Sequence, residues 1–302
     1  MTTLQLAKER QISKTRQWEQ ALTRLYTDYQ KYCKKVLRDF DSEDVHQARV
    51  NSRKLLTLLS ILDPGHSVTD KLYGTLKQAQ KRLGKVRDAD VLIEAFKDKR
   101  KQAKHAGASE TAELLKAVIE QQKGERKTYR KKLADKLPKL TGKSLNRQWE
   151  VFLSGELEQL AAKRDANVVM RELEVAFEQK KKTCRTLFKG PEAESAAAFD
   201  ALHKLRIAAK ELRYTANAAA FALNQKFHAD EEIYKDIQEQ LGSINDRRIW
   251  LEVLGASSPD KLGVSRRVWD EFTDSLRAEV LEALQHNEVI PFTEQPKPSH
   301  HS

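Results

Sequence analysis

Apolar residues recur along this chain three or four positions apart, as they do on one face of a helix, and no segment shows the alternation of a strand. Gly and Pro are few, 11 and 7 residues, and fall between the periodic stretches; Asp63-Pro64-Gly65 is a clear turn. The pattern therefore predicts an all-α protein. The expected helices cover residues 4–40, 43–62, 68–87, 89–105, 109–134, 144–163, 166–189, 194–224, 229–243, 246–254 and 264–286.

Two of these helices carry the same cationic pattern. The first has His46, Arg49 and Arg53, and the second has His203, Arg206 and Lys210. Offsets of three and seven return to one helix face, so each helix has a cationic stripe that includes a His. Lys54 and Arg213 extend these stripes. The opposite faces are apolar and predicted to be buried: Ala48, Leu55, Leu59 and Leu62 in the first helix, and Leu205, Ala209 and Leu212 in the second.

A second shared motif follows each stripe. Leu83-Gly84-Lys-Val-Arg87-Asp88 is echoed by Leu241-Gly242-Ser-Ile-Asn245-Asp246, and the separation from His to Gly is 38 residues in one copy and 39 in the other. A period of about 157 residues is too long for a solenoid repeat. We infer one duplicated helical unit and expect two bundles related by a pseudo-twofold axis.

The two copies differ in the helix that precedes the Leu-Gly pair. Lys77, Lys81 and Lys85 are spaced four apart in the first copy, where the second has Lys235, Glu239 and Ser243. The predicted site is therefore lopsided. A further run, Lys123–Arg147, carries ten Lys or Arg residues and two acidic ones, and could extend the basic surface.

The charge balance points to a polyanionic partner. The net charge is +11 and the sequence pI is about 9.4, which suits nucleic acid, polyphosphate or an anionic membrane surface, although a well-charged soluble surface has the same balance. No apolar run approaches the roughly 20 residues of a membrane-spanning helix, and residues 1–11 lack a secretory signal. We expect a cytoplasmic protein, in which Cys33 and Cys184 are half-buried thiols.

Three functions are weighed against each other. Arg and Lys donate to phosphate oxygens, and a His beside a polyanion favours its protonated form, which supports anion binding. An enzyme would need a metal-carboxylate cluster, a P-loop or a nucleophile. The Asp88/Asp90 pair and Asp246 are expected to cap helices and orient neighbouring Arg side chains, in preference to binding magnesium. Nucleic-acid binding fits the charge, but the stripes carry almost no aromatic residues for base stacking.

The paired motifs resemble the CHAD family, the conserved histidine α-helical domain, over about residues 12–286. The resemblance implies two four-helix bundles with pseudo-twofold symmetry around a central basic channel. It also implies binding of inorganic polyphosphate and association with polyphosphate granules. We divide the domain into repeats 12–164 and 165–286, followed by a tail, 287–302, expected to be disordered.

By this resemblance the chain is expected to be a stand-alone, non-catalytic polyphosphate-binding protein, because about 40 residues precede the first motif and leave no room for the triphosphatase domain of many relatives. No cofactor, metal, membrane or nucleic-acid partner is expected, whereas polyphosphate granule proteins are expected as possible partners. The expected polyphosphate-binding residues are His46, Arg49, Arg53, Lys54, Lys77, Lys81, Lys85, His203, Arg206, Lys210 and Arg213.

Overall fold

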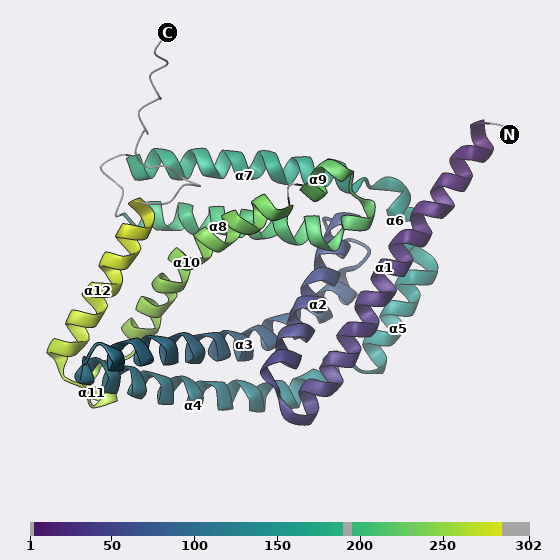
Figure 1. Ribbon diagram of the computed structural model, residues 1–302. Coiled ribbons are helices and arrows are strands. Elements are labelled where there is room, and N and C mark those ends of the chain that lie inside the picture. Colours follow the sequence, from purple (N-terminus) through teal and green to yellow (C-terminus); the bar gives the residue numbers. More distant parts are fainter. Residues whose placement is uncertain (1–2, 190–194, 230, 286–302) are drawn as a thin grey trace, which may run out of the picture. The chain divides into compact units, whose positions relative to one another are not determined.

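The computed structural model describes residues 3–189, 195–229 and 231–285, and each regular element in those ranges is helical (Figure 1). The all-α prediction is confirmed, while the predicted tail, 287–302, lies outside the described residues. The elements are α1 (Thr3–Asp39), α2 (Ser42–Leu62), α3 (Asp70–His105), α4 (Ser109–Leu140), α5 (Lys143–Val151), a π-helical segment (Phe152–Glu156), α6 (Leu157–Lys163), α7 (Ala166–Lys189), α8 (Ala196–Ala218), a 3₁₀ turn (Ala220–Ala222), α9 (Gln225–Ala229), α10 (Glu231–Gly255), α11 (Pro259–Leu262) and α12 (Arg266–Gln285).

The helices form two compact units that do not follow the order of the chain. The first unit contains the chain up to Asp98, then Ile119–Met170 and Tyr214–His228. Of the residues that the structure describes, the second contains those within Lys99–Val118, Arg171–Arg213 and 229–285. Helices α3, α4, α7 and α8 thus contribute residues to both units. The sequence repeats 12–164 and 165–286, like the pseudo-twofold pair of bundles, stay predictions.

Helix α1 supplies much of the apolar core of the first unit. It contacts α2, α6 and the 3₁₀ turn, and Trp18, Leu22 and Tyr29 are buried against them. The ring of Tyr26 stacks on Trp149 of α5 with centroids 4.2 Å apart. The apolar face predicted for α2 is buried as expected, because Ala48, Leu55, Leu59 and Leu62 are each at most 1 % exposed.

Two arginines of α4 hold the corner between α1 and α2. Phe40 has a φ of 58°, a left-handed conformation that side chains rarely adopt, so the chain turns sharply there. Arg126 donates to the Phe40 carbonyl at 3.3 Å, and Arg130 donates to the Asp39 carbonyl at 3.4 Å. Asp41 then caps α2 by accepting from the backbone N–H of Glu43 and Asp44. This corner sets the direction in which α2 begins, and with it the position of His46.

The predicted turn at Asp63-Pro64-Gly65 separates α2 from α3. Asp63 is buried, and its carboxylate accepts from the backbone N–H groups of Val68 and Thr69, both at 2.9 Å. Burial alone would raise the pKa of Asp63, but these donors outweigh it and hold the pKa below its usual value. The charged carboxylate therefore ties the start of α3 to the end of α2.

Two predicted helix breaks are wrong. The expected ends at 87 and 243 do not occur, since α3 continues from Asp70 to His105 and α10 from Glu231 to Gly255. A Gly inside a helix weakens it by about 1 kcal/mol but does not by itself end it. Each Leu-Gly motif therefore lies on an unbroken helix.

The second unit contains the pair α10 and α12. Glu279 of α12 accepts from Lys99 of α3 at 2.7 Å and from Arg247 of α10 at 3.0 Å. Burial would raise the pKa of Glu279, yet the two cations bring it below its usual value. The apolar face predicted for α8 is buried, with Leu205, Ala209 and Leu212 at most 1 % exposed.

Both cysteines are more deeply buried than expected. Cys33 and Cys184 are free thiols, 1 % and 0 % exposed, where the sequence predicted half-buried ones. Burial raises the pKa of each thiol to about 12, so both stay protonated at neutral pH.

Candidate anion-binding site

The cationic face of α2 lies against the Leu-Gly motif of α3 in the first unit. Gly84 is buried, and a Cβ placed there would lie 3.5 Å from Nε of Arg49. One turn further along α3, Arg87 donates through Nη1 to Oγ of Ser42 at 3.1 Å. Arg87 also acts electrostatically on His46. His46, Arg49 and Arg87 therefore form one cationic cluster where the two helices meet.

This cluster holds His46 in its neutral form. His46 is half-buried, and its pKa lies below the usual value because burial disfavours the charged ring. Arg87 and Arg49 lower the pKa further, against the opposing effect of Glu43. The unliganded site therefore presents a neutral imidazole among cations. A polyanion would shift the balance toward the protonated ring that the sequence predicted beside such a ligand.

Arg53 and Lys54 lie at different places in the first unit. The guanidinium of Arg53 lies over the ring of Tyr214, 4.3 Å from its centroid. Lys54 lines a separate cavity of about 560 Å³ whose other walls include Arg24 and Phe221. The two neighbours in sequence thus face different surroundings, as expected for residues about 100° apart around a helix.

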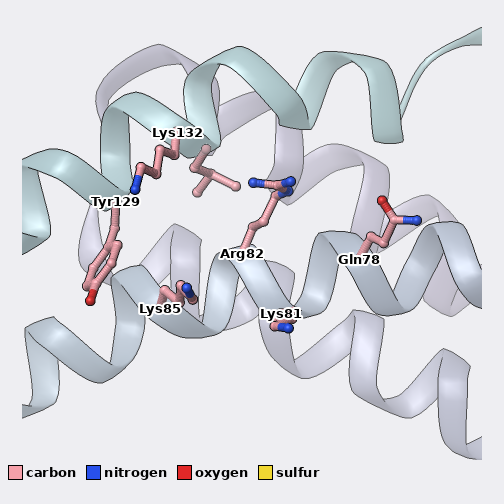
Figure 2. A pocket seen from close by; sticks show the side chains of 7 residues that line it. Gln78, Lys81, Arg82, Lys85, Tyr129 and Lys132 are labelled. Carbon is pink, nitrogen blue, oxygen red and sulfur yellow. The ribbon is translucent and has the colours of Figure 1, made fainter.

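The lysine stripe of α3 is exposed along its length. The Nζ atom of Lys77 lies 5.5 Å from the centroid of Tyr73, and that of Lys85 lies 5.6 Å from the centroid of Tyr129. Lys81 and Lys85 also line a pocket of about 320 Å³ between α3 and α4 (Figure 2). In the described part of the chain no carboxylate forms an ion pair with any of the three lysines.

The second unit brings the corresponding residues together. His203 and Arg206 of α8 line a narrow void, about 10 Å³, with Leu241, Asn245 and Arg248 of α10. Asn245 occupies the motif position of Arg87, and its Oδ1 accepts from Arg248 at 3.3 Å. Lys210 and Arg213 are half-buried further along α8. His46 and Arg49 therefore lie near Arg87 in the first unit, and His203 and Arg206 lie near Asn245 in the second. Arg87 and Asn245 hold the same motif position, three residues after the Gly.

Two of these cations were missed by the sequence prediction of the site. Arg87 belongs to the shared Leu-Gly motif and is the last residue of the helix expected over 68–87, and Arg248 has an acid, Asp90, at its counterpart position in the first copy. A continuous helix places residues three and four after Gly84 beside it on one side. The Leu-Gly segment was expected to be helical as far as residue 87, so the spacing of three residues from Gly84 was the signal that could have found Arg87.

The capping role predicted for Asp88, Asp90 and Asp246 is wrong, since all three lie inside helices. Asp90 instead forms an ion pair with Arg126 of α4, whose Nη2 also lies 3.4 Å from Oδ2 of Asp90. The expectation that such acids orient neighbouring arginines is confirmed for this pair. Within the described ranges, no three His, Cys, Asp or Glu side chains gather as a metal site would require.

Comparisons with known proteins bear on this arrangement. The family model of the CHAD domain matches residues 20–255, which include both His helices and both Leu-Gly motifs. The chain belongs to the CHAD family. CHAD domains as a family are associated with polyphosphate binding.

A solved structure supports the fold. The CHAD domain from the plant Ricinus communis is similar over 92 % of this chain and 89 % of its own, with a TM-score of 0.62 and 18 % sequence identity. No curated protein matches the chain. In the described ranges, no helix of this CHAD protein is long and apolar enough to cross a membrane.

Proposed function

We propose that this chain binds inorganic polyphosphate, without turning it over, through the cationic residues of α2, α3 and α8. The observation that carries the proposal is the repeated contact of a His/Arg pair with the Leu-Gly helix, at His46 and Arg49 in one unit and at His203 and Arg206 in the other. A ligand with many equally spaced charges can bind the same kind of cationic cluster in each of the two units.

The residue types suit a string of phosphates. Arginine presents a planar fork of donors that matches two phosphate oxygens, and lysine supplies a mobile point charge. Arg49, Lys77 and Lys81 form no ion pair with a carboxylate among the residues described. Their charges thus remain available to a ligand. The proposed contacts also include Arg53, Lys54, Lys85, Lys210 and Arg213, together with the newly placed Arg87 and Arg248.

The decisive experiment removes four cations at once. Replacing Arg49, Arg53, Arg206 and Lys210 with Gln should weaken binding of long-chain polyphosphate by about a hundredfold or more, because each charge-assisted contact contributes on the order of 1 kcal/mol or more. Circular dichroism should show unchanged helicity. Retained affinity in this variant would overturn the assignment of the site.

A control of equal charge separates specific contacts from net charge. Both variants lower the formal net charge by four, from +11 to +7. The control replaces four exposed lysines that take no part in the contacts described above. Its polyphosphate affinity should fall by about tenfold or less. These lysines are Lys101, Lys143, Lys163 and Lys226. Affinity should also fall steeply with salt, as expected for a binder of a charged polymer.

Binding without turnover has its own test. Incubation with polyphosphate and magnesium should release no phosphate above the rate of the quadruple variant. We further propose a cytoplasmic protein recruited to polyphosphate granules. A fluorescent fusion should collect on granules in cells that accumulate polyphosphate, whereas the quadruple variant should be diffuse.

A further inference from the structure

A pocket between α3 and α4 collects four cations from two helices of the first unit. Lys81, Arg82 and Lys85 come from α3, and Lys132 comes from α4 (Figure 2). Figure 2 shows Arg82 and Lys132 reaching from opposite helices into the space between them. Like charges that line one pocket repel one another, and an anion between them would relieve that repulsion.

The pocket faces away from the α2 cluster. Gly84 marks the side of α3 that meets Arg49. At about 100° per residue, Arg82 projects roughly 160° around the helix from that direction. Arg82 therefore points into a pocket that is distinct from the α2 cluster, while Lys81 and Lys85, which the proposed polymer site also uses, line the α3 side of that pocket.

Two acids, Glu125 and Asp135, lie near the pocket. The pKa of Tyr129 is raised by burial and by Glu125, with which its hydroxyl shares a hydrogen bond. Asp135 pairs with Lys136 at 3.0 Å, which is the main cause of its lowered pKa, while the pocket residue Arg82 acts on it electrostatically as the last cause. In the part of the chain that the structure describes, none of the four pocket cations forms an ion pair with a carboxylate.

The size of the pocket limits what it can hold. Its volume, about 320 Å³, is at the low end of the roughly 300–1,000 Å³ of small-molecule sites. The buried Leu133 and the ring of Tyr129 also line this small volume, so the ligand must be compact. A few linked phosphates fit this combination of small volume and four donors.

We propose that the α3–α4 pocket binds a compact oligophosphate of two or three phosphate units. The same chemistry is offered by free pyrophosphate or tripolyphosphate and by the end of a longer chain. This proposal shares Lys81 and Lys85 with the proposed polymer site but is tested apart from it, since Arg82 and Lys132 are not among the polymer contacts.

The test measures binding of tripolyphosphate by isothermal titration calorimetry. The variant Arg82→Gln/Lys132→Gln should bind it at least about tenfold more weakly than the original protein. The control Lys127→Gln/Lys131→Gln removes two exposed charges from other faces of α4 and should stay within about twofold. Arg82→Lys, which keeps the charge, should lose less affinity than Arg82→Gln.

A second pair of titrations separates this pocket from the polymer site. Arg49→Gln/Arg53→Gln should weaken the binding of long-chain polyphosphate more than that of tripolyphosphate. Arg82→Gln/Lys132→Gln should weaken the binding of tripolyphosphate more. Covalent capping of their ends should lower the affinity of long chains if the pocket takes a chain end, and should leave it unchanged if the pocket takes only free oligophosphate. Equal tripolyphosphate affinity in the folded pocket variant and the original protein would overturn the proposal.

Discussion

Arg53 of α2 stacks on Tyr214 of α8, with the guanidinium carbon 4.3 Å from the ring centroid. Tyr214 directly follows Arg213, the last cation of the second motif, yet it belongs to the first unit. The contact therefore joins residues of both sequence motifs within one compact unit.

Replacing Tyr214 should show how much this stacking stabilises the first unit. Tyr214→Leu should lower the free energy of unfolding by about 0.5–2 kcal/mol through loss of the cation–π contact. Tyr214→Phe, which keeps the ring, should change it much less. Urea denaturation of both variants, with and without Arg53→Gln, gives the coupling energy. A coupling near zero would contradict the prediction.

Polyphosphate affinity should increase as pH falls, and His46 should carry part of the increase. In the free protein, burial and then Arg87 lower the pKa of His46, so the ring is neutral at pH 7. A bound polyanion favours the imidazolium and raises that pKa, so the complex takes up a proton. The gain begins as pH falls below the bound-state pKa and levels off below the free-state pKa.

Titrations from about pH 8 to about pH 6 at constant ionic strength check this prediction. His46→Gln should flatten part of the profile. The folding stability of the free protein should change in the opposite direction and decrease as pH falls. The pKa of His46 is lower in the folded state, so protonation of the unfolded chain makes folding less favourable. His46→Gln should remove that loss of stability at acidic pH. An unchanged profile in the variant would argue against proton uptake at this ring.

Gly84 should tolerate a small side chain but not a large one. A Cβ at this position would meet Nε of Arg49 at 3.5 Å, an ordinary contact, so Gly84→Ala should be neutral or gain up to about 1 kcal/mol from helix propensity. Gly84→Leu should push Arg49 aside and weaken polyphosphate binding. The control is Gly124→Leu, at an exposed position of α4 where a Cβ would meet nothing within 4 Å. The measurements are polyphosphate affinity and the free energy of unfolding in urea. Unchanged affinity in Gly84→Leu would contradict the prediction.

Asp90 should contribute to stability through Arg126 and not through a metal. Asp90→Ala leaves the partly buried guanidinium without its carboxylate and should cost about 1–3 kcal/mol of unfolding free energy. Asp246→Ala, at an exposed position of α10, should change it by no more than about 0.5 kcal/mol. Magnesium should leave the melting temperature of the original protein unchanged. A magnesium-dependent rise that Asp90→Ala abolishes would restore the metal interpretation.

Helical periodicity was sufficient to predict which faces of α2 and α8 are buried. Leu55 and Leu59, like Leu205 and Leu212, lie in the core because an apolar stripe on a helix must pack against another element. The breaks predicted inside α3 and α10 were wrong, because Gly followed by Asp resembles a helix boundary locally. Packing overrides that signal where the bare backbone of Gly84 lets Arg49 approach.

The sequence by itself determined the helical fold, the family and the two cationic stripes, since these follow from residue type and spacing along the chain. Only the tertiary structure decided that Arg87 lies beside His46 and that Arg82 and Lys132 share a pocket. The physical reason is that a cluster between helices depends on their register and crossing, and spacing within one helix specifies neither.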